Sequence, residues 1–141
     1  MATRRPRSPP PPRSHCPISF ALELLGDRWT LLVVRDLLLK DKHYFREFAE
    51  SDEGIATNVL TDRLGNLIAH GIVTRVPDPQ DRRNVRYDLT AKGRDLAPIL
   101  VELIRWSGKH DPQTLAPRAY LRRIERDRER LVAELLEPRR R

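Results

Sequence analysis

A chain of 141 residues with a formal net charge of +7 is long enough for one ordinary hydrophobic core with appendages. No apolar run approaches the roughly 20 residues that a membrane helix needs, and the N-terminus lacks the apolar stretch of a secretory signal. The single cysteine, Cys16, excludes an internal disulfide and a cysteine-rich zinc site. We therefore expect a soluble, cytoplasmic protein without membrane contact.

The excess of positive charge lies at the two ends of the chain. Residues 1–16 hold four arginines and no acid, residues 17–110 hold 14 basic and 14 acidic side chains, and residues 111–141 hold nine arginines and six acids. Net charge alone is therefore weak support for nucleic-acid binding. The proline- and arginine-rich residues 1–15 predict a disordered tail. It is either an idle leader or a basic arm that neutralises DNA phosphates.

Three helices are predicted in the first third of the chain. Proline suits the first turn of a helix, which predicts Pro17–Leu25, ended by Gly26. Asp27 can accept hydrogen bonds from free backbone N–H groups at the start of a strongly apolar core helix over residues 28–39. A charged connector leads to a short helix over residues 44–49. A turn that contains glycine follows it, as in helix-turn-helix proteins.

In the next segment the spacing of apolar residues changes from that of a helix to that of a strand. From Val59 onward, apolar residues three and four apart predict a helix that stops at Gly71, because glycine enters the left-handed conformation without strain. Alternating residues then predict two strands, joined by a turn that ends in Arg82 and Arg83. A helix followed by a hairpin with a basic tip is typical of a winged helix. In that fold the helix enters the major groove and the tip contacts phosphate or the minor groove. The alternative is a helix and hairpin with no role in DNA binding.

Two further helices are predicted after the hairpin. Thr90 can cap the first, Gly108 is expected to end it, and Pro98 requires either a kink or a later start. Pro117 can begin the last helix, which runs to about Leu136. Its narrow apolar seam needs a partner surface, either on the same chain or on a second copy.

The predicted fold class is mainly α (α+β by content), a winged helix-turn-helix DNA-binding domain with a C-terminal helical extension. The expected organisation is a disordered basic tail at 1–15, the winged domain at 16–110, and a linker with an amphipathic helix and a basic end at 111–141.

Five motifs in order resemble the HxlR family of winged-helix transcriptional regulators, which is related to the MarR group. They are Cys16-Pro17, Gly26-Asp27-Arg28-Trp29-Thr30, Tyr44-Phe45-Arg46-Glu47-Phe48, Gly54-Ile55-Ala56-Thr57-Asn58 and Tyr87-Asp88-Leu89-Thr90-Ala91-Lys92-Gly93. The resemblance implies a bacterial homodimer that binds a pseudo-palindromic operator without a cofactor, more often as a repressor. It also implies a dimer surface built from the first and last domain helices, here Ile18, Leu22, Leu25, Leu96, Ile99, Leu100, Leu103 and Trp106. Many family members have serine where Ala56 stands and arginine where Tyr44 stands.

The candidate DNA contacts follow from side-chain chemistry. Base edges suit the amide and hydroxyl groups at the start of the reading helix, and phosphates suit the arginines. Asp62 is expected to face a base amino group or a neighbouring arginine. The full set is Thr57, Asn58, Thr61, Asp62, Arg63, Arg82, Arg83 and Arg86.

A catalytic role is not expected. The four histidines are scattered, no pair has zinc-ligand spacing, and no glycine-rich loop or Ser/His/Asp set is present. The alternatives to a specific regulator are a protein-interaction module with weak or no specific DNA binding, and a nonspecific nucleic-acid binder.

Cys16 is a candidate redox-sensing residue, because some members of the family that the chain resembles sense electrophiles or oxidants through a cysteine at this place. Arg13 and His15 supply positive charge that could favour the thiolate. The options are alkylation or a disulfide between two subunits. The alternative is a small buried residue at the start of a helix.

Overall fold

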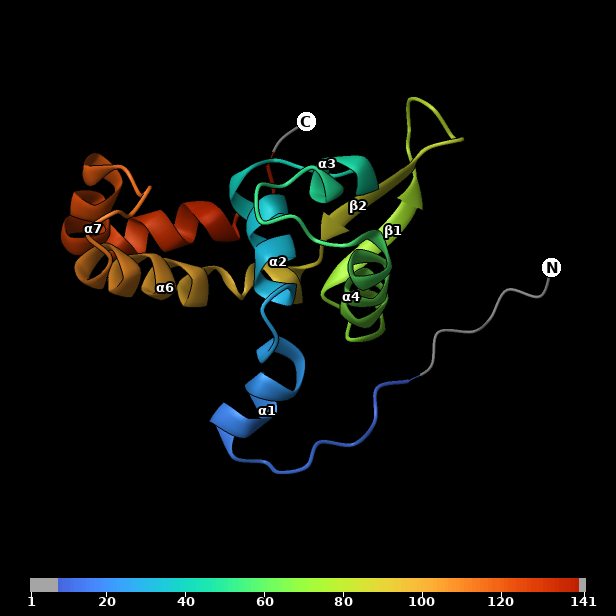
Figure 1. Ribbon diagram of the computed structural model, residues 1–141, viewed down its shortest axis with the longest axis horizontal. Coiled ribbons are helices and arrows are strands. Elements are labelled where there is room, and N and C mark those ends of the chain that lie inside the picture. Colours follow the sequence, from blue (N-terminus) through green and yellow to red (C-terminus); the bar gives the residue numbers. More distant parts are fainter. Residues whose placement is uncertain (1–7, 140–141) are drawn as a thin grey trace. The chain divides into compact units, whose positions relative to one another are not determined.

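The computed structural model describes residues 8–139 (Figure 1). The chain forms two compact units, Met1–Gly93 and Arg94–Arg141. The boundaries predicted from the sequence, after residues 15 and 110, differ from this division and stay a prediction. Residues 8–15 form neither helix nor strand. The predicted tail and basic end fall partly on residues 1–7 and 140–141, which lie outside the described residues.

In the first unit, helices precede a small sheet, in the order α1 (Pro17–Leu25), α2 (Thr30–Leu39), α3 (Phe45–Ala49) and α4 (Thr57–Ala69). Helix α1 has the predicted bounds, and α2 begins two residues later than predicted. The carboxylate of Asp27 accepts hydrogen bonds from the N–H groups of Trp29 and Thr30, at 2.8 and 3.0 Å, and so satisfies free N–H groups at the start of the helix.

The apolar face of α4 packs in the core of this unit against α2. Leu60, Leu64 and Leu67 are at most 2% exposed, so the predicted spacing does place one stripe of the helix inside. Phe48 of α3 meets the ring of Tyr87 edge to face, with 6.1 Å between ring centroids. Burial of one stripe leaves the polar face of α4 exposed to solvent.

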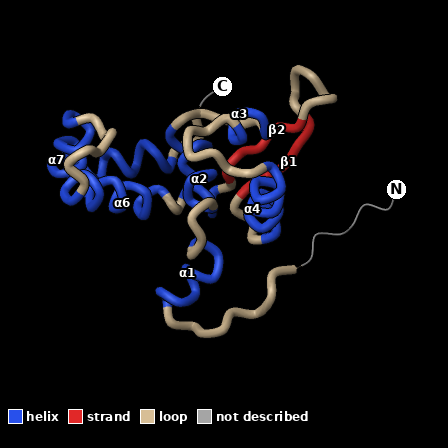
Figure 2. Tube along the Cα trace, viewed as in Figure 1, coloured by secondary structure: helices blue, strands red, loops and turns tan. Residues whose placement is uncertain are grey.

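A two-stranded antiparallel hairpin follows α4 directly (Figure 2). Gly71 has a φ of +70°, which confirms the predicted end of the helix. Strand β1 (Val73–Pro77) pairs with β2 (Val85–Leu89), and the register joins Val73 to Leu89 at one end and Pro77 to Val85 at the other. Helices α3 and α4 with this hairpin form a winged helix-turn-helix, and the predicted fold class is confirmed.

The second unit is a pair of helices. After the short helix α5 (Ala91–Arg94), helix α6 (Ala97–His110) begins with Pro98 in its first turn, which confirms the predicted later start. The prediction that Gly108 ends this helix is wrong, because the helix continues to His110. A Cβ atom at Gly108 would lie 2.5 Å from Leu121 Cδ2, so glycine here permits close packing.

Helix α7 (Arg118–Leu136) packs on α6 through Val101, Ile124 and Leu131, which are at most 3% exposed. Of the two partner surfaces predicted for its apolar seam, the structure has the one on the same chain. At Asp127 the backbone leaves the helical conformation, with φ −146° and ψ 42°. None of the described helices is both long and apolar enough to cross a lipid bilayer.

Candidate nucleic-acid interface

The N-terminus of α4 is uncapped and exposed. Ala56 occupies the N-cap position, and no side chain among the described residues bonds to the free N–H groups there. The sequence left capping either to Thr57 or to no side chain, and the structure shows no side-chain cap. Thr57 and Asn58 are exposed in this first turn. Free N–H groups and the helix dipole together favour an anion at such an end.

Further along the same face, the hydroxyl of Thr61 donates to the carbonyl oxygen of Thr57 at 2.9 Å. This bond engages the hydroxyl, whereas the methyl group of the exposed side chain remains available for an apolar contact. Asp62 accepts a hydrogen bond from Arg63 Nη1 at 2.5 Å. Of the two surroundings expected for Asp62, the structure therefore has the neighbouring arginine.

Arg63 is bonded to Asp27, which lies just before α2, and does not point freely to solvent. Its Nε donates to Asp27 Oδ2 at 2.8 Å, and its side chain is 26% exposed. Burial raises the pKa of Asp27, but hydrogen bonds, with those from Thr30 and Arg63 foremost, outweigh it and lower the pKa to about 2. Arg63 was expected to contact phosphate, and in this structure it holds α4 to the start of α2.

The tip of the hairpin carries two exposed arginines. The side chain of Arg83 is 91% exposed, and its Nε donates to Asp81 Oδ1 at 3.1 Å. Arg82 forms no ion pair with any residue that the structure describes. Arg86, by contrast, lies on β2, where its Nε donates to Asp88 Oδ2 at 3.0 Å and its side chain is 17% exposed. It therefore belongs to the paired strands of the wing and not to its tip loop.

The wing is fastened to residues 43 and 44, just before α3, a feature that the sequence did not predict. The hydroxyl of Tyr44 donates to Asp78 Oδ2 at 2.6 Å, and this bond raises the pKa of Tyr44. The N–H of Tyr87 donates to the carbonyl oxygen of His43 at 2.8 Å. The one sequence signal was the replacement of a common family arginine by Tyr44, which takes part in this attachment.

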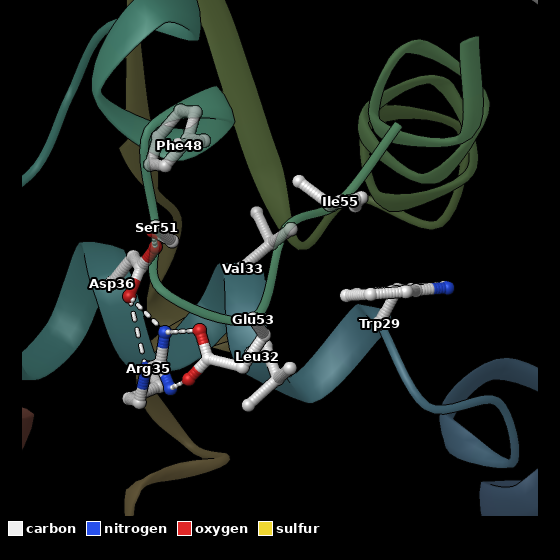
Figure 3. Close-up of a pocket in the computed structure, with 9 residues that line it drawn as sticks. All are labelled: Trp29, Leu32, Val33, Arg35, Asp36, Phe48, Ser51, Glu53 and Ile55. Carbon is white, nitrogen blue, oxygen red and sulfur yellow. Dashed lines mark hydrogen bonds and ion pairs between the residues drawn. The ribbon is translucent and has the colours of Figure 1, made fainter. Parts of the chain in front are cut away.

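A charged network holds the turn between α3 and α4 (Figure 3). Arg35 lies between the carboxylates of Asp36 and Glu53, and the hydroxyl of Ser51 donates to Asp36 Oδ2 at 2.5 Å. The bond to Arg35 lowers the pKa of Glu53 to about 2. The adjoining cavity measures only about 10 Å³, room for about one water molecule, and is therefore too small for an organic ligand.

Cys16 lies at the start of α1 and is exposed, so its interpretation as a buried residue is wrong. The nearby backbone N–H groups of Ser19 and Ile18 lower the pKa of its thiol. The helix N-terminus is thus the cause of the shift. Arg13 instead lies 3.8 Å from the carboxylate of Glu23. The described residues contain no group of three or more His, Cys, Asp or Glu side chains that could hold a metal ion.

The residues expected at a dimer surface differ in exposure. The exposed ones form rows on α1 and α6: Ile18 at 69%, Leu22 at 57%, Ile99 at 39%, Leu103 at 46% and Trp106 at 64%. Leu25 and Leu96 are half-buried, and Leu100, at 5% exposed, is already buried within the chain. The apolar row on α6 lines an open groove of about 600 Å³.

The model of the HxlR-like helix-turn-helix family matches residues 24–114, which include α2, α4 and both strands of the wing. The chain belongs to the HxlR-like helix-turn-helix family. This HxlR-type chain therefore belongs to a family of DNA-binding transcriptional regulators.

An uncharacterized HTH-type transcriptional regulator of Mycobacterium tuberculosis is 37% identical over 105 residues, 74% of this chain and 65% of its own length. The chain spans 64–65% of the length of several curated relatives that it matches. Among solved structures, PA1607 is 36% identical with a TM-score of 0.68, covering 75% of this chain and 74% of its own. The redox regulator HypR in its oxidized form is 31% identical with a TM-score of 0.60, covering 67% of this chain and 97% of its own.

Proposed function

We propose that this protein is a homodimeric, sequence-specific double-stranded DNA-binding regulator that acts in the cytoplasm as a repressor. The observation that carries the proposal is the exposed, uncapped polar end of α4 followed by a wing with an arginine tip. Asn58 reads a base edge, the methyl group of Thr61 packs on thymine, and Thr57 and the free N–H groups approach a phosphate. Arg82 and Arg83 contact the backbone or the minor groove.

Structural support for a dimer comes from the exposed apolar rows on α1 and α6. A row of exposed apolar residues on a helix marks an interaction surface. Ile18 and Leu22 of α1, with Ile99, Leu103 and Trp106 of α6, are the proposed contacts. A dimer presents two reading helices to two half-sites one helical turn apart, which matches a palindromic operator.

The experiment that tests the function begins with selection of bound sequences from a random duplex library. The selected duplex and a random one are then titrated with the wild-type chain and with an Arg82→Ala/Arg83→Ala variant, while sedimentation monitors dimer formation. We expect preference for the selected duplex, and weaker DNA binding by the variant with the dimer intact. A chain that binds neither duplex would support the interaction module, and equal binding to both would support a nonspecific binder.

Thiol sensing at Cys16 is a second, separable part of the proposal. The exposed thiol, its lowered pKa and the likeness to the redox regulator HypR support it. Diamide would take two electrons and two protons from the Cys16 thiols of two subunits, leaving one disulfide between them, and a quinone would alkylate the thiol. Mass spectrometry with parallel DNA titration tests this, with Cys16→Ser as control. Unchanged DNA binding by fully modified protein would refute sensing and leave the DNA-binding proposal intact.

A further inference from the structure

Helix α7 carries a row of arginines on the side turned away from its apolar seam. Arg118, Arg122 and Arg126 stand four residues apart, so that at 100° per residue each lies 40° from the next around the helix. The buried side of the same segment is marked by Leu121 and Ile124, which pack toward Val101 of α6. The same arithmetic places the centre of the arginine row about 130° around the helix from the midpoint of these two residues, and therefore off the buried side.

The side chains of these three arginines differ from those of the other arginines of α7, because they have no partner among the described residues. Arg123 donates to Glu134 at 2.5 Å, and Arg128 donates to Glu102 of α6 at 2.5 Å. By contrast, the three side chains of the row are exposed and form no ion pair or hydrogen bond with any described residue.

Three acidic residues lie near the row, Glu125, Asp127 and Glu129, and none of them forms an ion pair with it among the described residues. Glu125 lies beside the row but accepts a hydrogen bond from Arg105 of α6 at 2.7 Å. Glu129 follows the break in the helix at Asp127. The row therefore presents three uncompensated positive charges along two turns of helix.

Such a row needs an explanation, because like charges four residues apart destabilise a helix. A polyanion removes the repulsion, and guanidinium groups bind phosphate oxygens in a bidentate manner. Within residues 118–126 no large apolar side chain is exposed. A protein partner would need an apolar centre, whereas a nucleic-acid backbone suits a polar, positive and hydrated surface.

We propose that Arg118, Arg122 and Arg126 form a second DNA-contacting surface, which binds the phosphate backbone of a duplex without regard to base sequence. The inference rests on the proposed function for the identity of the ligand, and adds a contact that lies outside the family-matched residues 24–114. The C-terminal extension thus raises the affinity for DNA without changing which sequence is preferred.

The test compares the full-length wild type with two triple variants, Arg118→Gln/Arg122→Gln/Arg126→Gln and the charge-preserving Arg118→Lys/Arg122→Lys/Arg126→Lys. Affinity for a random 30-base-pair duplex is measured by fluorescence anisotropy from about 50 to 200 mM KCl. In the glutamine variant, the slope of log affinity against log salt should fall in magnitude by about 0.9 for each phosphate that is no longer neutralised, up to about 2.7 per subunit. The lysine variant should retain the wild-type slope.

A second measurement uses the unmodified chain. Phenylglyoxal modifies accessible guanidinium groups, and mass spectrometry after treatment with and without the random duplex should show protection at Arg118, Arg122 and Arg126. An unchanged slope in the glutamine variant, or equal modification with and without DNA, overturns the proposal.

Failure of the proposed function would look different. If the wild type does not prefer a selected duplex over the random one, sequence-specific regulation fails, whereas the change in salt slope still decides the role of the arginine row. If the row acts as proposed, the ratio of affinities for selected and random duplexes stays the same in the glutamine variant.

Discussion

Arg63 of the reading helix and Asp27 before α2 are joined by a hydrogen bond of 2.8 Å from Nε to Oδ2. The same carboxylate oxygen accepts the N–H groups of Trp29 and Thr30, so one atom both caps α2 and holds α4. The orientation of the exposed helix is thereby coupled to the start of the core helix. This relationship gives two predictions about stability.

The first prediction concerns the coupling between the two side chains. Asp27→Asn and Arg63→Gln, alone and combined, should show a coupling free energy of about 1–2 kcal/mol in urea unfolding, because the bond is charged on both sides and partly buried. The exposed pair Arg46 and Glu50, 3.5 Å apart, is the control and should couple far more weakly. Coupling no larger than that of the control would show that Asp27 and Arg63 act independently.

The second prediction is a pH dependence carried by Asp27. Its pKa of about 2 in the folded chain lies below the ordinary value of 3.8. Its contribution to the free energy of unfolding is therefore fully present above pH 3.8 and is lost as the pH falls through 2. From this difference in pKa we expect the ionised carboxylate of Asp27 to add about 2 kcal/mol to the free energy of unfolding at neutral pH. The free energy of unfolding of wild type and Asp27→Asn should therefore converge between about pH 5 and pH 2. Parallel curves over that range would contradict the assignment.

The third prediction contrasts two glycines. A Cβ atom at Gly93 would overlap the carbonyl oxygen of Ile72 and lie 2.9 Å from Leu89 Cδ2, whereas at Gly65 it would meet nothing within 4 Å. Gly93→Ala should therefore cost about 2–3 kcal/mol of stability, because backbone must move. Gly65→Ala should stabilise the chain by up to about 1 kcal/mol through helix propensity. Thermal unfolding of both variants tests this, and a neutral Gly93→Ala would be the contrary result.

The fourth prediction separates base reading from general affinity. Asn58 is exposed in the first turn of α4, and Asn66 is exposed near the other end of the same helix. Asn58→Ala should reduce the preference for the selected duplex over single-base variants of it by about 1–3 kcal/mol at one position. Asn66→Ala is the matched control and should leave that preference unchanged. Equal effects of the two substitutions would remove Asn58 from the reading set.

Much of the fold could be predicted because it depends on near neighbours in sequence. The spacing of Leu60, Leu64 and Leu67, the glycine stop at Gly71 and the helix start after Pro117 are local properties, and the structure has each of them. The family resemblance that the sequence motifs indicated is likewise confirmed.

The features that the sequence did not predict depend on contacts between residues that are distant in sequence. Arg63 was predicted to contact phosphate, because its partner Asp27 lies 36 residues earlier and no periodicity in the sequence links the two residues. The attachment of Tyr44 to Asp78 spans 34 residues and was missed for the same reason. The candidate DNA contacts themselves stay a prediction, since their geometry is set by a duplex as much as by the chain.

The close approach of Leu121 to Gly108 has a consequence for comparing genomes. Position 108 falls inside the segment shared with the family, whereas α7 falls beyond it. A homologue with a bulky residue aligned at this place could not let a terminal helix fold back in the same manner. The residue aligned with Gly108 should therefore predict, from sequence alone, which homologues can carry such a packed C-terminal helix and which cannot.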